Sequence, residues 1–123
     1  MNVEGLDHIA LSVRDVEASA RWYCDVLGLK REHDDVWPGE PVFVVKGNTG
    51  IALFAKRDDG DKPAAIRMLH FAWRTDAIGF ESAQRELRER GINFDFQDHE
   101  ISKSIYFHDP DGHQIEITTY EIR

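Results

Sequence analysis

The chain repeats itself at a fixed distance of 62 residues. Identity between the two copies is low, but apolar positions and glycines coincide along both, as in a duplicated supersecondary unit. One copy alone would bury little apolar surface, because a small sheet with one helix makes a small core, so the two copies are expected to pair. The aligned stretches are residues 7–11 with 69–73, 42–45 with 104–107 and 50–54 with 112–116.

Each copy is expected to fold as a strand, a helix and three further strands, giving an α+β chain of two βαβββ modules. Alternation with period two predicts the first strand of each module, and helical spacing of apolar residues predicts the helix that follows. Asp15 can cap the first helix and Gly28 can end it, while the second helix is expected from Asp76 to Arg90 with Gly91 as its stop. The expected strands are 6–13, 30–36, 41–46, 50–56, 67–74, 92–97, 103–108 and 113–120.

Residues 1–123 are expected to form a single domain. Module 1 covers about residues 4–56 and module 2 about residues 66–123, and a polar linker at 57–65 joins them. The sequence is compatible with two arrangements. The modules can pair within one chain, or each can pair with its counterpart in a second chain.

Composition excludes several functional classes. With 41% hydrophobic and 31% charged residues, the chain is globular, and no run approaches the roughly 20 apolar residues that cross a bilayer. The net charge of −8 opposes binding to nucleic acid or anionic lipid. Residues 1–5 lack the profile of a signal peptide, and the single cysteine, Cys24, excludes a disulfide framework. We therefore expect a cytoplasmic protein that acts on a small molecule, without a nucleic-acid or membrane partner.

Strand parity places several polar side chains on one kind of surface. Side chains two residues apart share a face of a strand. The alternating sets that include Asp7 and Leu69 are expected to pack toward the helices. The side chains expected on the faces that carry no helix are His8, His70, Tyr106 and Glu116.

Two neutral imidazoles and one carboxylate make a ligand set that suits Fe(II), Mn(II), Zn(II) or Ni(II). Taken singly, His8, His70 and Glu116 each fit a structural role, but their convergence favours a metal site. The repeat offset lays Phe54 over Glu116, so module 1 supplies no fourth ligand. Three protein ligands leave positions open for a substrate or for oxygen, as metal catalysis requires.

Three segments of the chain resemble the vicinal oxygen chelate superfamily. This superfamily includes glyoxalase I, extradiol dioxygenases, fosfomycin-resistance thiol transferases, methylmalonyl-CoA epimerase and bleomycin-resistance proteins. The segments are residues 6–13, 22–29 and 106–116, and the last contains the tight turn Asp-Pro-Asp-Gly at 109–112.

The resemblance covers essentially the whole chain and implies a cup-shaped mixed sheet around a metal ion. Carried over residue by residue, the metal ligands of that family fall on His8, His70 and Glu116. Many short members of the superfamily pair their modules across a homodimer. In that arrangement each site would take His8 from one chain and the other two ligands from its partner.

The positions at which this chain departs from the pattern of each subfamily indicate which of the subfamily activities to favour. Glyoxalase I uses four protein ligands, and Phe54 stands where one of them would be. The fosfomycin transferases carry a threonine two residues after the first histidine ligand, where this chain has Ala10. The extradiol signature is matched at His99 and Tyr106, although Gln97 departs from it. An extradiol-type dioxygenase is therefore the favoured single subclass.

The roles implied by this resemblance are those of a metal-dependent enzyme. The metal is expected to act as a Lewis acid on a substrate that binds through two neighbouring oxygens. Tyr106 is expected to donate a hydrogen bond to the substrate, and His99 to act as an acid or base, with an exposed loop position as its structural alternative. The alternatives are a non-catalytic binding protein of the bleomycin-resistance type, and a lyase, thiol transferase or isomerase of the same superfamily.

Overall fold

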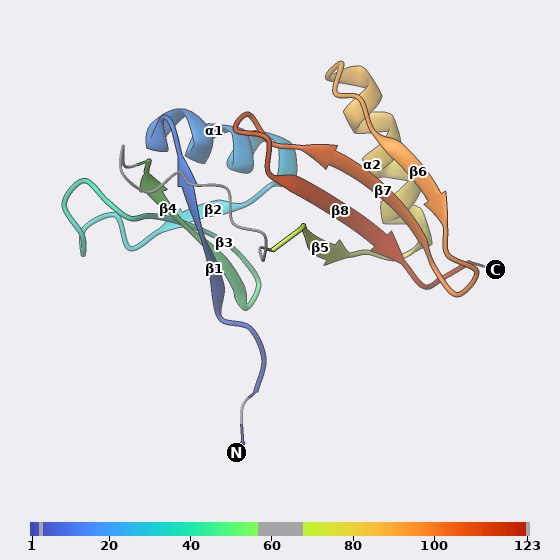
Figure 1. Ribbon diagram of the computed structural model, residues 1–123, viewed down its shortest axis with the longest axis horizontal. Coiled ribbons are helices and arrows are strands. Elements are labelled where there is room, and N and C mark those ends of the chain that lie inside the picture. Colours follow the sequence, from blue (N-terminus) through green and yellow to red (C-terminus); the bar gives the residue numbers. More distant parts are fainter. Residues whose placement is uncertain (3, 57–67, 123) are drawn as a thin grey trace. The chain divides into compact units, whose positions relative to one another are not determined.

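The computed structural model describes residues 1–2, 4–56 and 68–122, so the expected linker at 57–65 lies outside the described residues. The chain divides into two compact units, Met1–Pro63 and Ala64–Arg123. Each unit contains one helix and one four-stranded mixed sheet, as Figure 1 shows. The α+β class and the two βαβββ modules are therefore confirmed.

Unit 1 contains a sheet with the strand order β1-β4-β3-β2. Strand β1 runs parallel to β4, the other neighbours are antiparallel, and the helix contacts β2, β3 and β4. The helix begins where the Asp15 side chain accepts a hydrogen bond from the amide of Ala18 at 2.9 Å, and it ends at Gly28 with a φ of 72°. Its elements are β1 (His8–Val13), α1 (Val16–Leu27), β2 (Lys30–Glu32), β3 (Val42–Lys46) and β4 (Thr49–Ala55).

Unit 2 repeats this topology, with the strand order β5-β8-β7-β6. Its helix contacts β8 and begins where Asp76 accepts a hydrogen bond from the amide of Gly79 at 2.7 Å. A left-handed Gly91, with a φ of 70°, follows the helix as expected. Its elements are β5 (Phe71–Arg74), α2 (Ala77–Glu89), β6 (Asp95–Asp98), β7 (Lys103–His108) and β8 (Gln114–Thr119).

Strand parity holds within the paired strands. Buried residues alternate along β3, whereas β4 and β8, which each have a strand on both sides, are buried at consecutive residues on both faces. The most buried strand side chains are Val13, Val44, Ile51, Leu53, Ile105, Phe107 and Ile115. The faces without a helix are therefore set by the sequence pattern, and they carry the polar side chains discussed below.

Strands β2 and β5 differ most from their predicted lengths, and both are shorter. Pairing of β5 with β8 begins at Phe71, so the prediction that Leu69 packs inward is wrong, and Leu69 is 67% exposed. Strand β2 ends at Glu32 because His33 adopts a φ of 63° and accepts a hydrogen bond from the amide of Val36 at 3.0 Å. A turn therefore replaces the second half of the expected strand.

Candidate metal centre

Glu116 lies at the middle of the helix-free face of unit 2. It pairs with Ala72 on β5 and with Tyr106 on β7, and it is only 9% exposed. His70 immediately precedes β5, and its Nε2 atom lies 3.0 Å from Oε1 of Glu116. Two of the three predicted ligands are thus brought together within one unit.

The Ser104 hydroxyl group fixes the other oxygen of Glu116. It donates a hydrogen bond of 2.6 Å to Oε2, and Thr118 Oγ1 lies 3.0 Å from the same hydroxyl oxygen. All three side chains are buried. A carboxylate held in this way directs Oε1 toward His70, as partners outside a ligand set orient metal ligands.

His99 and Tyr106 also come together on unit 2. His99 follows β6, and its Nε2 atom lies 3.0 Å from the Tyr106 hydroxyl oxygen. The Tyr106 ring lies 5.7 Å from the His70 ring, centre to centre. Burial raises the pKa of Tyr106, and the negative charge of Glu116 raises it further, so this phenol is held in its neutral, hydrogen-bond-donating form.

The turn between β7 and β8 sets the register that places Tyr106 beside Glu116. Asp109 Oδ1 accepts hydrogen bonds from the amides of Asp111 at 2.9 Å and His113 at 2.8 Å. Oδ2 of the same carboxylate lies 2.8 Å from Nδ1 of His113. This hydrogen bond to Asp109 raises the pKa of His113. The turn itself was predicted from the sequence, but the part played by His113 in it was not.

His8 is the first residue of β1 and lies in unit 1, on the face without a helix. Its Nδ1 atom lies 2.8 Å from Oδ2 of Asp7, and its ring meets the edge of the Phe43 ring at 5.4 Å. The prediction that Asp7 packs toward the helix is therefore wrong, because this residue precedes the paired strand and its side chain is 87% exposed. An Nδ1–H donated to Asp7 would leave the Nε2 lone pair of His8 available for a metal ion.

These residues fit a divalent metal ion in chemistry and, for one pair, in geometry. Two ligands bound at right angles, each about 2.1 Å from one ion as in octahedral sites, would lie about 3.0 Å apart. The distance between His70 Nε2 and Glu116 Oε1 is 3.0 Å, which is compatible with this spacing and is also the length of an N–H···O hydrogen bond. Over the described residues, no three His, Cys, Asp or Glu side chains lie close enough together to hold a metal ion.

The strand registers change the correspondence between the two units. Glu116 on β8 pairs with Ala72 and Tyr106, and the β4 residue in the matching place, between Ala10 on β1 and Phe43 on β3, is Ala52. The prediction that Phe54 lies over Glu116 is therefore wrong, because Phe54 pairs with Ser12, two residues further along. An alanine side chain cannot bind a metal ion, so unit 1 offers no fourth ligand at this position.

Comparison with known proteins defines the family. The model of the Glyoxalase/Bleomycin resistance protein/Dioxygenase superfamily matches residues 5–117, and the chain belongs to this superfamily. Metallothiol transferase FosB from Staphylococcus epidermidis (strain ATCC 12228) is 31% identical, over 97% of this chain and 84% of that protein. The name of this relative does not support the favoured extradiol subclass and points to the thiol transferases among the alternatives.

Solved structures of the same fold agree with this assignment. A glyoxalase/dioxygenase from Nostoc punctiforme superposes with a TM-score of 0.79 and 28% identity, covering 96% of this chain and 92% of that one. Lactoylglutathione lyase from Agrobacterium tumefaciens superposes with a TM-score of 0.77 and 22% identity, covering 97% and 96%. In the part of the chain that the structure describes, no helix is both long and apolar enough to cross a membrane.

Proposed function

We propose that this protein is a divalent-metal-dependent enzyme in which His8, His70 and Glu116 hold one metal ion. The observation that carries the proposal is the 3.0 Å separation of His70 Nε2 and Glu116 Oε1, with Oε2 of the same carboxylate held by Ser104. A bound ion would supply Lewis acidity toward a substrate that binds through neighbouring oxygens. Ala52, at the β4 position that matches Glu116, supplies no fourth ligand, which supports an open site.

The side chains around the proposed ligands have distinct roles. Ser104 orients Glu116 through its hydrogen bond of 2.6 Å. Tyr106, kept neutral by its raised pKa, donates a hydrogen bond to a substrate oxygen. His99, at 3.0 Å from the phenol, exchanges a proton with the substrate or with solvent through Tyr106.

Thiol transfer is the first reaction to test. The support comes from the name of the relative that is 31% identical, a metallothiol transferase. Ala10 lies on β1 two residues after His8, where the fosfomycin transferases carry a threonine. We therefore expect an acceptor other than fosfomycin.

Extradiol ring cleavage is the second candidate. One observation favours it: the contact of 3.0 Å between His99 and Tyr106, the two residues that match the extradiol signature. This reaction requires Fe(II) and oxygen, whereas thiol transfer requires a thiol and no oxygen. Metal identity and the need for oxygen therefore separate the two candidates.

The test measures metal content by mass spectrometry on untagged wild-type protein and on His70→Ala, Glu116→Gln and His108→Ala. The last is a matched control, because His108 lies on the same sheet but is exposed at the end of β7. We expect about one ion per chain in the wild type and in the control, and loss of that ion in the other two variants. The metal-loaded protein is then assayed for thiol consumption with electrophiles and, if it holds iron, for cleavage of catechols.

Two results would contradict the proposal. Retention of the metal in both His70→Ala and Glu116→Gln would place the ion elsewhere. Failure of the wild type to bind any divalent ion after reconstitution would make the protein a metal-free binder of the bleomycin-resistance type.

A further inference from the structure

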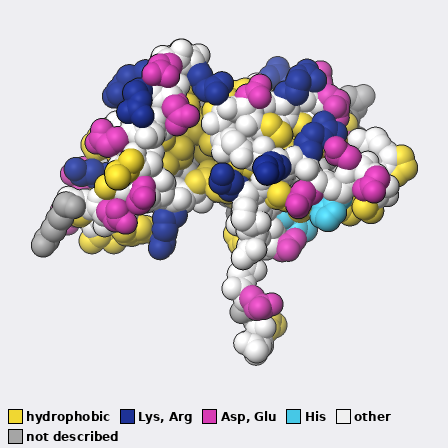
Figure 2. Space-filling model, turned by 180° about the vertical axis from the view of Figure 1, so that it is seen from behind, with side chains coloured by type: hydrophobic (Ala, Val, Ile, Leu, Met, Phe, Trp, Pro, Cys, Tyr) yellow, Lys and Arg dark blue, Asp and Glu magenta, His cyan; other side chains and the backbone are white. Residues whose placement is uncertain are grey.

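Unit 1 contains a pocket of about 850 Å³ that the proposed reaction does not explain. It opens on the helix-free side of the sheet, and all of its lining residues belong to this unit. Figure 2 shows histidines surrounded by acidic and hydrophobic side chains next to the N-terminal segment. The lining residues that matter here are Asp7, His8, Glu32, His33, Trp37 and Phe43.

Aromatic rings form one wall of this pocket. The Phe43 ring lies 5.4 Å from the ring of His8, 5.7 Å from that of His33 and 6.3 Å from that of Trp37. His33 and Trp37 are also edge to face at 5.6 Å. Gly50 makes room for the cluster, since a Cβ atom there would come within 2.6 Å of the Phe43 ring.

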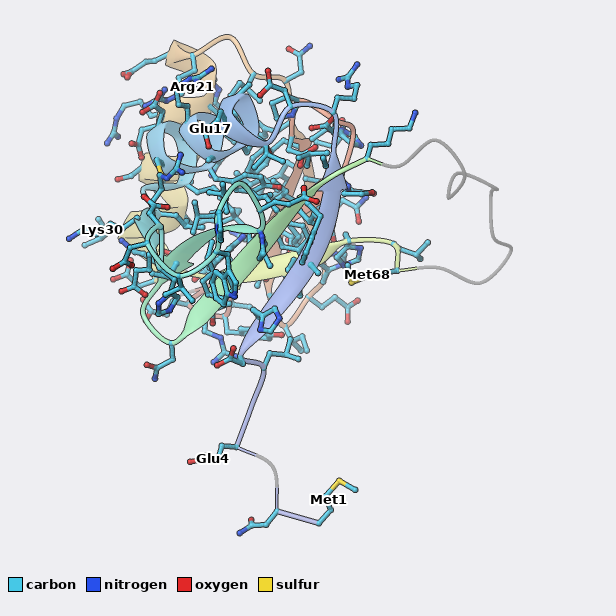
Figure 3. The ribbon with its side chains drawn as sticks, turned by 90° about the vertical axis from the view of Figure 1, so that its left-hand side faces the viewer. Met1, Glu4, Glu17, Arg21, Lys30 and Met68 are labelled. Atoms are coloured by element: carbon cyan, nitrogen blue, oxygen red, sulfur yellow. The ribbon has the colours of Figure 1, made fainter. Side chains whose placement is uncertain are left out.

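The charge around the pocket has one sign. Glu4, Asp7 and Glu32 line it, and its described lining residues include no lysine or arginine. Arg31 belongs to the opposite face, because it pairs with the buried Val44 and is held by Glu17 on α1 at 2.9 Å and by Asp34. Lys30 pairs with Val45 and so shares the face of Glu32, but its side chain points outward from the edge strand β2 in Figure 3 and does not line the pocket. An anionic ligand would therefore find no partner for its charge among these side chains.

A bare metal ion does not fit this pocket either. Over the described residues of unit 1, no three of its carboxylates and histidines lie close enough together to hold one. Carboxylates that lie apart from one another, beside the faces of aromatic rings, suit a larger organic cation such as an alkylated ammonium group. Such a cation is attracted by the ring faces and by the negative charge at the same time.

We propose that the pocket binds an organic cation, such as a substituted ammonium group, against Trp37 and Phe43 with Glu32 and Asp7 supplying the counter-charge. Because His8 also lines the pocket, the bound cation would lie beside a proposed metal ligand and would belong to the substrate or to its co-substrate. Binding of the cation needs only side chains of unit 1, so it does not depend on the metal.

The test uses benzyltrimethylammonium as the probe, with benzyl alcohol and benzylphosphonate as its neutral and anionic counterparts. Binding is measured by NMR titration in low salt with a metal chelator present. We expect the cation to bind more tightly than either counterpart, Trp37→Ala to weaken it about fivefold, and Trp37→Phe to retain most of the affinity. Glu32→Gln should weaken binding about twofold, because the carboxylate is exposed and screened by water.

Controls separate this proposal from the metal site and from misfolding. Glu81→Gln, a change at an exposed carboxylate on α2, should bind the probe as the wild type does. His70→Ala should also bind it normally, even though this variant loses the proposed metal. Trp37 is 39% exposed, so its truncation is expected to leave the circular dichroism spectrum unchanged. Equal binding of the three probes, unchanged binding in Trp37→Ala, or loss of binding in His70→Ala would each overturn the proposal.

Discussion

At the scale of single residues, the candidate centre depends on partners that hold each ligand in one orientation. Glu116 offers one oxygen to His70 and has the other fixed by Ser104. His8 has a carboxylate on Nδ1, supplied by Asp7. If these side chains bind a metal ion as proposed, such partners would keep each ligand atom oriented for binding.

His113 is the residue whose effect should depend most clearly on pH. Its hydrogen bond to Asp109 raises its pKa in the folded protein, so the protonated form stabilises the fold. This stabilisation is complete below the pKa of an unfolded histidine and fades as pH rises through the higher folded pKa. We expect His113→Gln to lower the free energy of unfolding by about 1 kcal/mol at pH 5.5 and by clearly less at pH 8.5.

Chemical denaturation at the two pH values measures this difference. His108→Gln serves as the control, because His108 is an exposed histidine on the same hairpin. An equal loss of stability at both pH values in His113→Gln would show that His113 acts through packing and not through its charge.

At the scale of elements, the aromatic cluster around Phe43 depends on close packing between β3 and β4 in unit 1. The Phe43 ring lies over Gly50, where a Cβ atom would stand 2.6 Å and 2.7 Å from two ring atoms. Gly50→Ala should therefore destabilise the protein by about 1–3 kcal/mol, because the ring must move. In a Phe43→Ala background the same change should be nearly neutral, and a double-mutant cycle of unfolding free energies measures the difference. If Gly50→Ala lowers the free energy of unfolding equally in both backgrounds, its effect comes from the backbone at residue 50 and not from contact with the Phe43 ring.

The helices and central strands could be predicted from the sequence because local signals agree with the tertiary structure. Asp15 and Gly28 bound α1 as their residue types indicate, and the prediction for β7 was Lys103–His108 without error. The same parity argument correctly placed Tyr106 and Glu116 on one face. The parity argument works for these two residues because both lie within the continuous hydrogen-bonded pairing of β7 with β8.

The sequence was less informative where pairing begins or stops. Parity was extended to Asp7 and Leu69, but each precedes the first residue of its strand and has an exposed side chain. The left-handed His33 that ends β2 gives only a weak signal, because histidine adopts positive φ more often than most residues but still uncommonly. The cluster of rings around Phe43 depends on this turn, so the pocket of unit 1 was not predictable from the alternation of apolar residues.

At the scale of the whole molecule, the duplication divides the proposed ligands unequally. His8 belongs to unit 1, whereas His70 and Glu116 belong to unit 2. If the three side chains bind one ion as proposed, a complete site takes one copy of each unit, and these can come from one chain or from two. The resemblance to short members of the superfamily leads us to expect a homodimer whose sites are shared between its chains.

Mixing of variant chains tests this arrangement. If the sites are shared, a His8→Ala chain and a His70→Ala chain, each unable to bind metal alone, form one complete site in every mixed dimer. After random exchange of chains we expect about a quarter of the wild-type metal content, because half of the dimers are mixed and each holds one site of two. Mixing His70→Ala with Glu116→Gln should restore nothing, because neither chain then supplies an intact unit 2. Failure of the first mixture to recover metal, with chain exchange verified, would mean that His8 joins His70 and Glu116 of its own chain.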